Sequence, residues 1–146
     1  MRKTISLFVI CIFFICSNMI AFGFNKEDLL KLKETKKGTG GTFSNCNLEG
    51  ASLVNLDLRE ADLTGANLKG AIIENTNLSQ ANLAGADLTG SNLRMVDFTG
   101  AKLNEIIMQG SNLLFVDFSG ADLEEAFLQG VKMKGVLLRQ ANLTDV

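Results

Sequence analysis

The chain has 146 residues, 47% of them hydrophobic and 21% charged, a balance that is typical of one folded domain and excludes a disordered chain. It contains no His, Trp, Tyr or Pro, so the commonest general base and metal ligand are missing, which weighs against an enzyme. The formal net charge is −2 and no basic stripe runs along the chain, so direct nucleic-acid binding is not predicted.

The N-terminal 23 residues differ in composition from the rest of the chain. Two basic residues precede an apolar run over residues 5–15, and the small residues Ala21 and Gly23 have the spacing of a signal-peptidase site. This pattern predicts a secretory signal peptide over residues 1–23, cleaved after Gly23. We therefore expect a periplasmic or secreted protein.

A retained membrane anchor is the alternative for this segment. Residues 5–22 just reach the length that spans a bilayer, although Ser17 and Asn18 interrupt them. A lipoprotein anchor is disfavoured, because Cys11 and Cys16 each follow an isoleucine where a lipobox has a small residue. The membrane would be a partner of the chain only if this segment were not cleaved.

Residues 24–40 are predicted to form an N-terminal capping helix and a hinge. Asn25 is placed as the N-cap of a helix over residues 26–37, with Asp28 at its third position, and Gly38 ends it. The helix would cover the apolar end of the body that follows. The hinge into that body contains three glycines: Gly38, Gly40 and Gly41.

Residues 41–146 repeat with a period of five. Every fifth residue from Phe43 to Leu143 is large and apolar, 21 positions in all. The residue two positions before each is mostly Ala, and the residue between them is mostly Asp or Asn. Glycine recurs at the fifth position, as at Gly65 and Gly100, where a tight turn with positive φ is expected.

A period of five fits neither an α-helix nor a β-strand, so the chain has to turn once per repeat to keep the large residues buried. If each pentad forms one side, four sides close a square coil, and residues twenty positions apart stack on one another. Each side then points one large and one small residue inward, because two large residues would overfill the interior. The pattern predicts an all-β solenoid with one continuous apolar core.

The stretch ADLTGANLKGA, from Ala61 to Ala71, resembles the pentapeptide-repeat family, whose pattern is A(D/N)LXX. The phase of the repeat does not slip between residues 43 and 146. The resemblance implies a right-handed quadrilateral β-helix, here of about five coils behind the short capping helix. A leucine-rich repeat is rejected, because its unit is about 20–29 residues with unequal leucine spacing.

Some inward positions that are usually small hold bulkier residues. They predict C-terminal coils that are wider or less regular than the others. These residues are Leu56, Val96, Ile106, Val116, Val131 and Val136.

The last coil is a candidate homodimer end. A solenoid exposes apolar side chains and unpaired backbone groups at its ends, and pairing with a second copy would continue both sheets. The resemblance adds that some family members dimerise through this end. The residues expected there are Val131, Met133, Val136, Leu138 and Leu143.

Apolar residues also occupy positions that should face solvent. The candidate partner-contact patch consists of Met95, Leu114, Phe115, Ile107 and Phe127. Met95 and Phe115 are twenty residues apart and should stack. Ile107 and Phe127 should stack in the same way on another side, and Leu137 takes the same outward position two sides further on. The functional hypothesis is a contact surface for a partner, and the alternative is that single surface hydrophobics are normal or that distorted coils bury them.

No catalytic, cofactor or metal site is predicted. Cys46, the only thiol that cleavage would leave, occupies an inward small position and is expected to be buried and inert. Asp97 and Asp117 should lie in adjacent coils, but a single carboxylate pair is a weak indication of a metal. The Asp and Asn positions are better explained as partners of backbone groups.

The sequence thus favours a non-enzymatic exported module that is structural or binds an unknown protein in the cell envelope. The alternative comes from the family resemblance, since some cytoplasmic members resemble B-form DNA and bind DNA gyrase. Residues 43–146 contain 7 basic and 13 acidic residues, a modest net charge of −6 for such mimicry. The predicted signal peptide and three cations, Lys132, Lys134 and Arg139, argue against it further.

Overall fold

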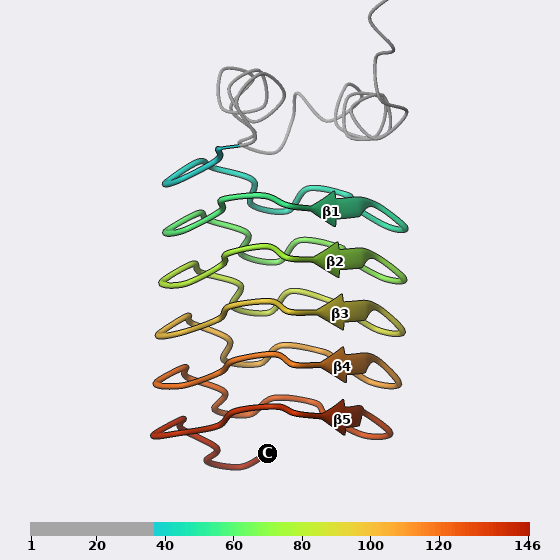
Figure 1. Cartoon of the computed structure of the whole chain (residues 1–146), viewed down its shortest axis with the longest axis vertical. Coiled ribbons are helices and arrows are strands. Elements are labelled where there is room, and N and C mark those ends of the chain that lie inside the picture. Colours follow the sequence, from blue (N-terminus) through green and yellow to red (C-terminus); the bar gives the residue numbers. More distant parts are fainter. Residues whose placement is uncertain (1–36) are drawn as a thin grey trace, which may run out of the picture.

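A computed structural model describes residues 37–146, which form a stack of four-sided coils (Figure 1). The predicted signal peptide and almost all of the predicted capping helix lie outside these described residues. No helix that could span a membrane occurs within residues 37–146.

Five short strands form one parallel sheet along a single side of the stack (Figure 1). The strands are β1 (Ser52–Val54), β2 (Ile72–Glu74), β3 (Asn92–Arg94), β4 (Asn112–Leu114) and β5 (Lys132–Lys134). Each pairs with the next at a shift of twenty residues, as in Leu53↔Ile73. The other three sides pair through isolated bridges at the same shift, such as Asp62↔Asn82. The predicted twenty-residue coil is therefore confirmed.

We number the four sides in chain order, so that side 3 contains the strands and is opposite side 1, while side 2 is opposite side 4. The central inward residues show which pentads belong to each side. They are Leu63, Leu83 and Leu103 on side 1; Leu68, Leu88 and Met108 on side 2; Ile73, Leu93 and Leu113 on side 3; and Leu78, Phe98 and Phe118 on side 4.

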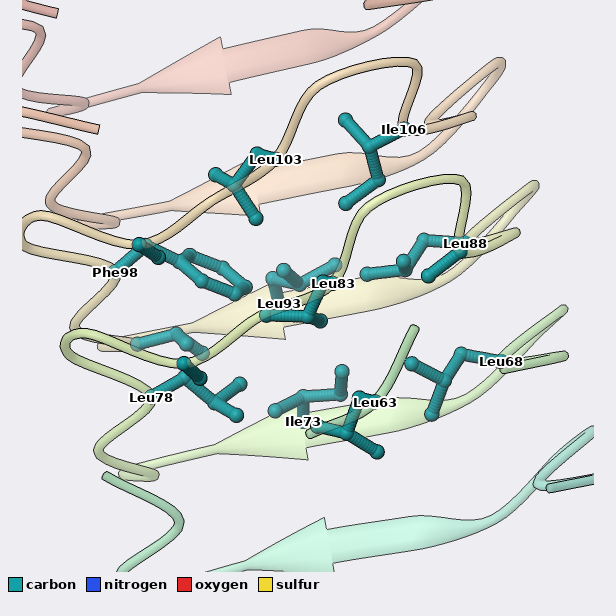
Figure 2. Close-up of a cluster of buried hydrophobic side chains, with 14 of the residues drawn as sticks. Leu63, Leu68, Ile73, Leu78, Leu83, Leu88, Leu93, Phe98, Leu103 and Ile106 are labelled. Carbon is teal, nitrogen blue, oxygen red and sulfur yellow. The ribbon is translucent and has the colours of Figure 1, made fainter. Parts of the chain in front are cut away.

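The core is a column of these central residues together with the small residues two positions before them. Figure 2 shows the labelled leucines, Ile73 and Phe98 projecting into the space that the coils enclose. Nearly all of them are fully buried, which stabilises the fold by about 1.5–3 kcal/mol for each large side chain. On side 4 the rings of Phe98 and Phe118 stack with centroids 5.2 Å apart.

Every corner of the solenoid is made by a residue with positive φ. From Gly40 to Asp145, each fifth position has φ between 48° and 71°, whether it is glycine or carries a side chain. On sides 1, 2 and 4 the corner is closed by a turn hydrogen bond, such as Ala51 N donating to the Leu48 carbonyl at 3.0 Å. The corner after side 3 has no such bond in the described residues, because the extended strand runs directly into it.

The expectation that bulky inward residues make the C-terminal coils irregular is wrong. The register continues unchanged to Asp122↔Asn142. The reason is that most of the bulky residues share one column on side 4, directly after the open corner, so the extra volume is spread along the whole stack. This column contains Leu56, Thr76, Val96, Val116 and Val136, while Ile106 and Val131 lie on sides 2 and 3.

The first coil begins earlier in the chain than the sequence suggested. Lys37 already pairs with Asp57, and Gly38 N donates to the Asp57 carbonyl at 2.7 Å. Gly40 has the positive φ of a corner, and Gly41 N donates to the Gly38 carbonyl at 2.8 Å. Gly38 and Gly40 therefore form part of side 4 and its corner, and Gly41 begins side 1, instead of forming a hinge that precedes the solenoid.

Two stacked serines in the core provide a test of how the interior treats polar groups. The Ser111 hydroxyl donates to the Met108 carbonyl at 2.7 Å, whereas the buried Ser91 hydroxyl has no partner among residues 37–146. We expect Ser91→Ala to leave the free energy of unfolding unchanged or to raise it by up to about 1 kcal/mol. Ser111→Ala should lower it by about 1 kcal/mol, because a hydrogen bond is lost.

Urea denaturation of both variants, followed by far-UV circular dichroism, measures these changes. Equal destabilisation by the two substitutions would show that the Ser91 hydroxyl is satisfied in solution.

Candidate binding surfaces

Asp and Asn side chains on sides 1, 2 and 4 complete the hydrogen bonding of the outer backbone. Each accepts a hydrogen bond from the N–H two residues later, as Asp62 does from Thr64 at 3.0 Å and Asn77 from Ser79 at 2.9 Å. Eleven such bonds recur along the stack. This explains why short side chains with an acceptor oxygen dominate the position. The predicted backbone role of these residues is confirmed.

The same hydrogen bonds to the backbone explain why Asp97 and Asp117 lie one above the other on side 4. Asp97 and Asp117 are bridge partners in adjacent coils, as expected, and each accepts the N–H of the residue two positions on at 2.8 Å. Within residues 37–146 no group of three or more His, Cys, Asp or Glu side chains is arranged to hold a metal ion. Cys46 is buried, as its position predicted.

Three apolar residues replace Asp or Asn at this outward position and forgo the hydrogen bond. Ile107 and Phe127 lie one above the other on side 2 as bridge partners, and Phe127 is 45% exposed. Leu137 follows Asp117 on side 4 and is also exposed. Because a hydrogen bond of this kind is worth about 0.5–1.5 kcal/mol, these residues reduce the stability of the fold locally.

A second apolar surface lies at the corner between sides 3 and 4, and we call it the corner ridge: Met95, Leu114 and Phe115. Met95 and Phe115 are corner residues with φ of 53° and 55°, and their side chains are 51% and 55% exposed. Leu114, at the end of β4, is half-buried beside Phe115. The ridge is a protruding surface, since its side chains extend from a corner of the coil.

Gly135 allows the Phe115 ring to lie against the next coil. A Cβ atom added at Gly135 would be 2.4 Å from Phe115 Cδ1, so a larger residue there would displace the ring from this position. The repeat predicted Gly135 as a turn glycine but not its contact with Phe115, although it lies twenty residues after Phe115 in the same corner column.

The five predicted contact residues do not form one surface. Ile107 and Phe127 are on side 2, and the corner ridge is separated from them by the whole width of side 3, occupied by β4 and β5. The candidate patch therefore consists of two surfaces on different sides, as the spacing of its two stacked pairs predicted, because the chain crosses side 3 between residues 107 and 115.

Acidic and basic residues gather on opposite sides of the C-terminal coils, a feature that the net charge did not reveal. Side 1 has a hollow of about 300 Å³, the acidic hollow, which is lined by Asn104, Glu105, Asp122, Glu124 and Glu125. Side 3 instead presents Lys132 and Lys134 on β5. Arranging the charged residues by their place in the twenty-residue coil would have shown this separation.

Ion pairs neutralise three cations of the earlier coils, Arg59, Lys69 and Arg94. Arg59 binds Asp57 at 2.8 Å, and its hydrogen bond lowers the pKa of Asp57 to about 2. Lys69 binds Asp87 at 3.1 Å; burial opposes ionisation of Asp87, but hydrogen bonds from Thr89 and Lys69 leave its pKa below the ordinary value.

On side 3, Arg94 pairs with Glu74. Across the part of the chain that the structure describes, no carboxylate pairs with the cations of the last coil, Lys132, Lys134 and Arg139.

The last coil exposes the residues of the predicted dimer end. Met133, Leu138 and Leu143 are exposed, and Val131 and Val136 are half-buried, although their counterparts one coil earlier are buried. The N–H groups of Met108 and Phe118 donate to the following coil, whereas within residues 37–146 those of Leu128 and Leu138 have no backbone acceptor.

A protein-family model described as pentapeptide repeats matches residues 43–80, 73–104 and 107–145. None of the curated proteins compared with the chain matches it.

Solved structures with the same architecture include a pentapeptide repeat protein from the Arabidopsis thaliana thylakoid lumen, with 28% identity, a TM-score of 0.51, and 73% of this chain and 71% of that one covered. A pentapeptide repeat protein from Nostoc PCC 7120 has 25% identity and a TM-score of 0.39 over 68% of this chain and 85% of its own. A trypsin-treated form of QnrB1, a plasmid-mediated fluoroquinolone resistance protein, has 19% identity and a TM-score of 0.39 over 73% and 69% of the two chains.

Restoring the backbone acceptor on side 2 should stabilise the protein. In Ile107→Asn the new amide oxygen can accept the Gln109 N–H, so we expect the free energy of unfolding to rise by up to about 1 kcal/mol. The reverse change in the same column, Asn67→Ile, removes the bond to Lys69 N and should lower it by a similar amount. Thermal denaturation of both variants measures the difference. If Ile107→Asn destabilises the protein as much as Asn67→Ile, then packing of Ile107 on Phe127 outweighs the hydrogen bond.

Proposed function

The chain belongs to the pentapeptide-repeat family, and from this membership we propose that it is a non-enzymatic, exported binding module that acts by surface contact in the cell envelope. The observation that supports this function best is the replacement of Asp or Asn by Ile107 and Phe127 on side 2. The replacement forgoes backbone hydrogen bonds and exposes apolar surface, and a contact with a protein partner would compensate for both costs.

A non-enzymatic role agrees with how the coil is filled. The interior is packed with apolar side chains, and the one thiol of the described residues is buried among them. A solenoid of this kind instead offers side chains on its outer sides, where binding residues can change without loss of the core.

Export is supported by the apolar, signal-like segment over residues 1–23. The similar Arabidopsis protein, which lies in the thylakoid lumen, also occupies a compartment enclosed by a membrane. The exposed last coil supports a homodimer as a further possibility for the partner, because a second copy would cover Met133, Leu138 and Leu143.

The DNA-mimic alternative receives less support. A mimic of the duplex needs acidic residues over much of its surface, whereas here side 3 of the last coil presents Lys132 and Lys134, opposite the acidic hollow of side 1. The likeness to QnrB1 is one of fold only, at 19% identity.

Cell fractionation followed by intact and native mass measurement tests the proposed export. We expect a soluble exported product that begins at Phe24, with twice the chain mass under native conditions if the last coil dimerises. A full-length chain in the cytosol would contradict export and favour the DNA mimic. A full-length chain in the membrane would mean an anchored module.

Photo-crosslinking in cells tests the contact surface on side 2. A photoreactive amino acid at Phe127 should yield one discrete adduct with another protein, because this side chain is exposed beside Ile107. The matched control places the same photoreactive amino acid at Asn67, which lies in the same column of side 2 in an earlier coil, and should yield no adduct. Equal adducts from both positions would argue against a contact specific to the apolar pair.

A further inference from the structure

The corner ridge adjoins cations of side 3, two of which, Lys132 and Lys134, lack acidic partners among residues 37–146. Leu114 is paired in the sheet with Arg94 on one flank and with Lys134 on the other. Lys132 lies on the same strand as Lys134, and within residues 37–146 neither forms an ion pair. Exposed apolar side chains and unpaired lysines therefore lie together on side 3 and its corner.

The shape of this surface is convex. Met95 and Phe115 extend from a corner of the coil and are more than half exposed, and the Phe115 ring leans over Gly135 toward the last coil. The acidic hollow of these coils lies on the opposite side of the body from the ridge. A protruding apolar edge needs no matching cavity when it enters the interface of a lipid bilayer.

We propose that the corner ridge docks the protein on the surface of an anionic lipid bilayer. Met95 and Phe115 enter the boundary between headgroups and acyl chains, while Lys132 and Lys134 contact lipid phosphates at the level of the headgroups. The inference deepens the proposed envelope location, on which it rests, by naming the lipid surface as a partner of the ridge.

The distribution of charge sets the orientation of docking. With side 3 on the bilayer, the acidic hollow of side 1 faces away from the anionic lipids, so the net negative charge of the body does not prevent contact. Asp97 and Asp117 lie on side 4 next to the ridge and oppose binding. The docking is therefore weak and reversible, as a few cations and one aromatic side chain permit.

A single tryptophan reports on this contact in the full chain, because the protein has no Trp of its own. In the variant Phe115→Trp, emission should shift to the blue and be quenched by brominated acyl chains when phosphatidylglycerol vesicles are added. Phosphatidylcholine vesicles should give little response. Phe127→Trp, which places the probe on side 2, should respond to neither type of vesicle. If the N-terminal segment adsorbs to vesicles, the comparison still holds, because the emission of each tryptophan depends only on its own surroundings.

Charge reversal separates the lysines from the apolar ridge. Lys132→Glu and Lys134→Glu are added to the Phe115→Trp chain. Because each lost cation weakens binding by about fivefold, the lipid concentration that gives half of the maximal emission shift should rise by about 25-fold or more. The matched control Lys102→Glu, on side 1, should change it by less than twofold.

The proposal is overturned if the Phe115→Trp probe does not respond to phosphatidylglycerol vesicles, or responds equally to both lipids, or matches the Phe127→Trp probe. A shift produced by lipid-free envelope proteins instead of vesicles would assign the ridge to a protein partner and overturn it as well. These failures leave the proposed export intact, because that is decided by the location and mass of the product.

Discussion

The structure depends on backbone hydrogen bonds between residues one coil apart. A central residue donates its N–H to the coil that follows, as Leu63 does to the Asn82 carbonyl at 2.7 Å. Because this pairing repeats on all four sides, every side has five residues and every corner must turn with positive φ. Met95 and Phe115 adopt that conformation although it costs non-glycine residues about 1–2 kcal/mol. The pairing thus outweighs the local preference of the backbone.

This constraint separates the residues that hold the fold from those that are free to bind. The inward positions are filled by the core, and Asp or Asn at the middle outward position satisfies the backbone. An apolar residue at that position, such as Ile107 or Phe127, still pairs through its backbone, but its side chain accepts no hydrogen bond from the backbone N–H two residues later. Such departures from the repeat are therefore where function is most reasonably sought in a solenoid with a complete core.

The coil also decides how charges are distributed. Residues of like charge that are scattered along the sequence gather on one side when their spacing matches the twenty-residue turn. Glu105 and Glu125 meet in this way at the acidic hollow, while Lys132 and Lys134 lie across the body from it. A chain with a modest net charge thereby acquires two sides of opposite sign, and its contacts with partners depend on which side faces them.

The amino-acid sequence by itself determined the period, the buried positions and the stacking of residues twenty apart, because these follow from the five-residue spacing of large apolar side chains. It also indicated which residues face solvent, including Phe115 and Phe127. Only the tertiary structure decided that Gly135 makes room for the Phe115 ring and that the bulky residues of side 4 leave the register unchanged. These features depend on the direction of side chains at the corners and on how the interior accommodates their volume, and a linear spacing of residues specifies neither.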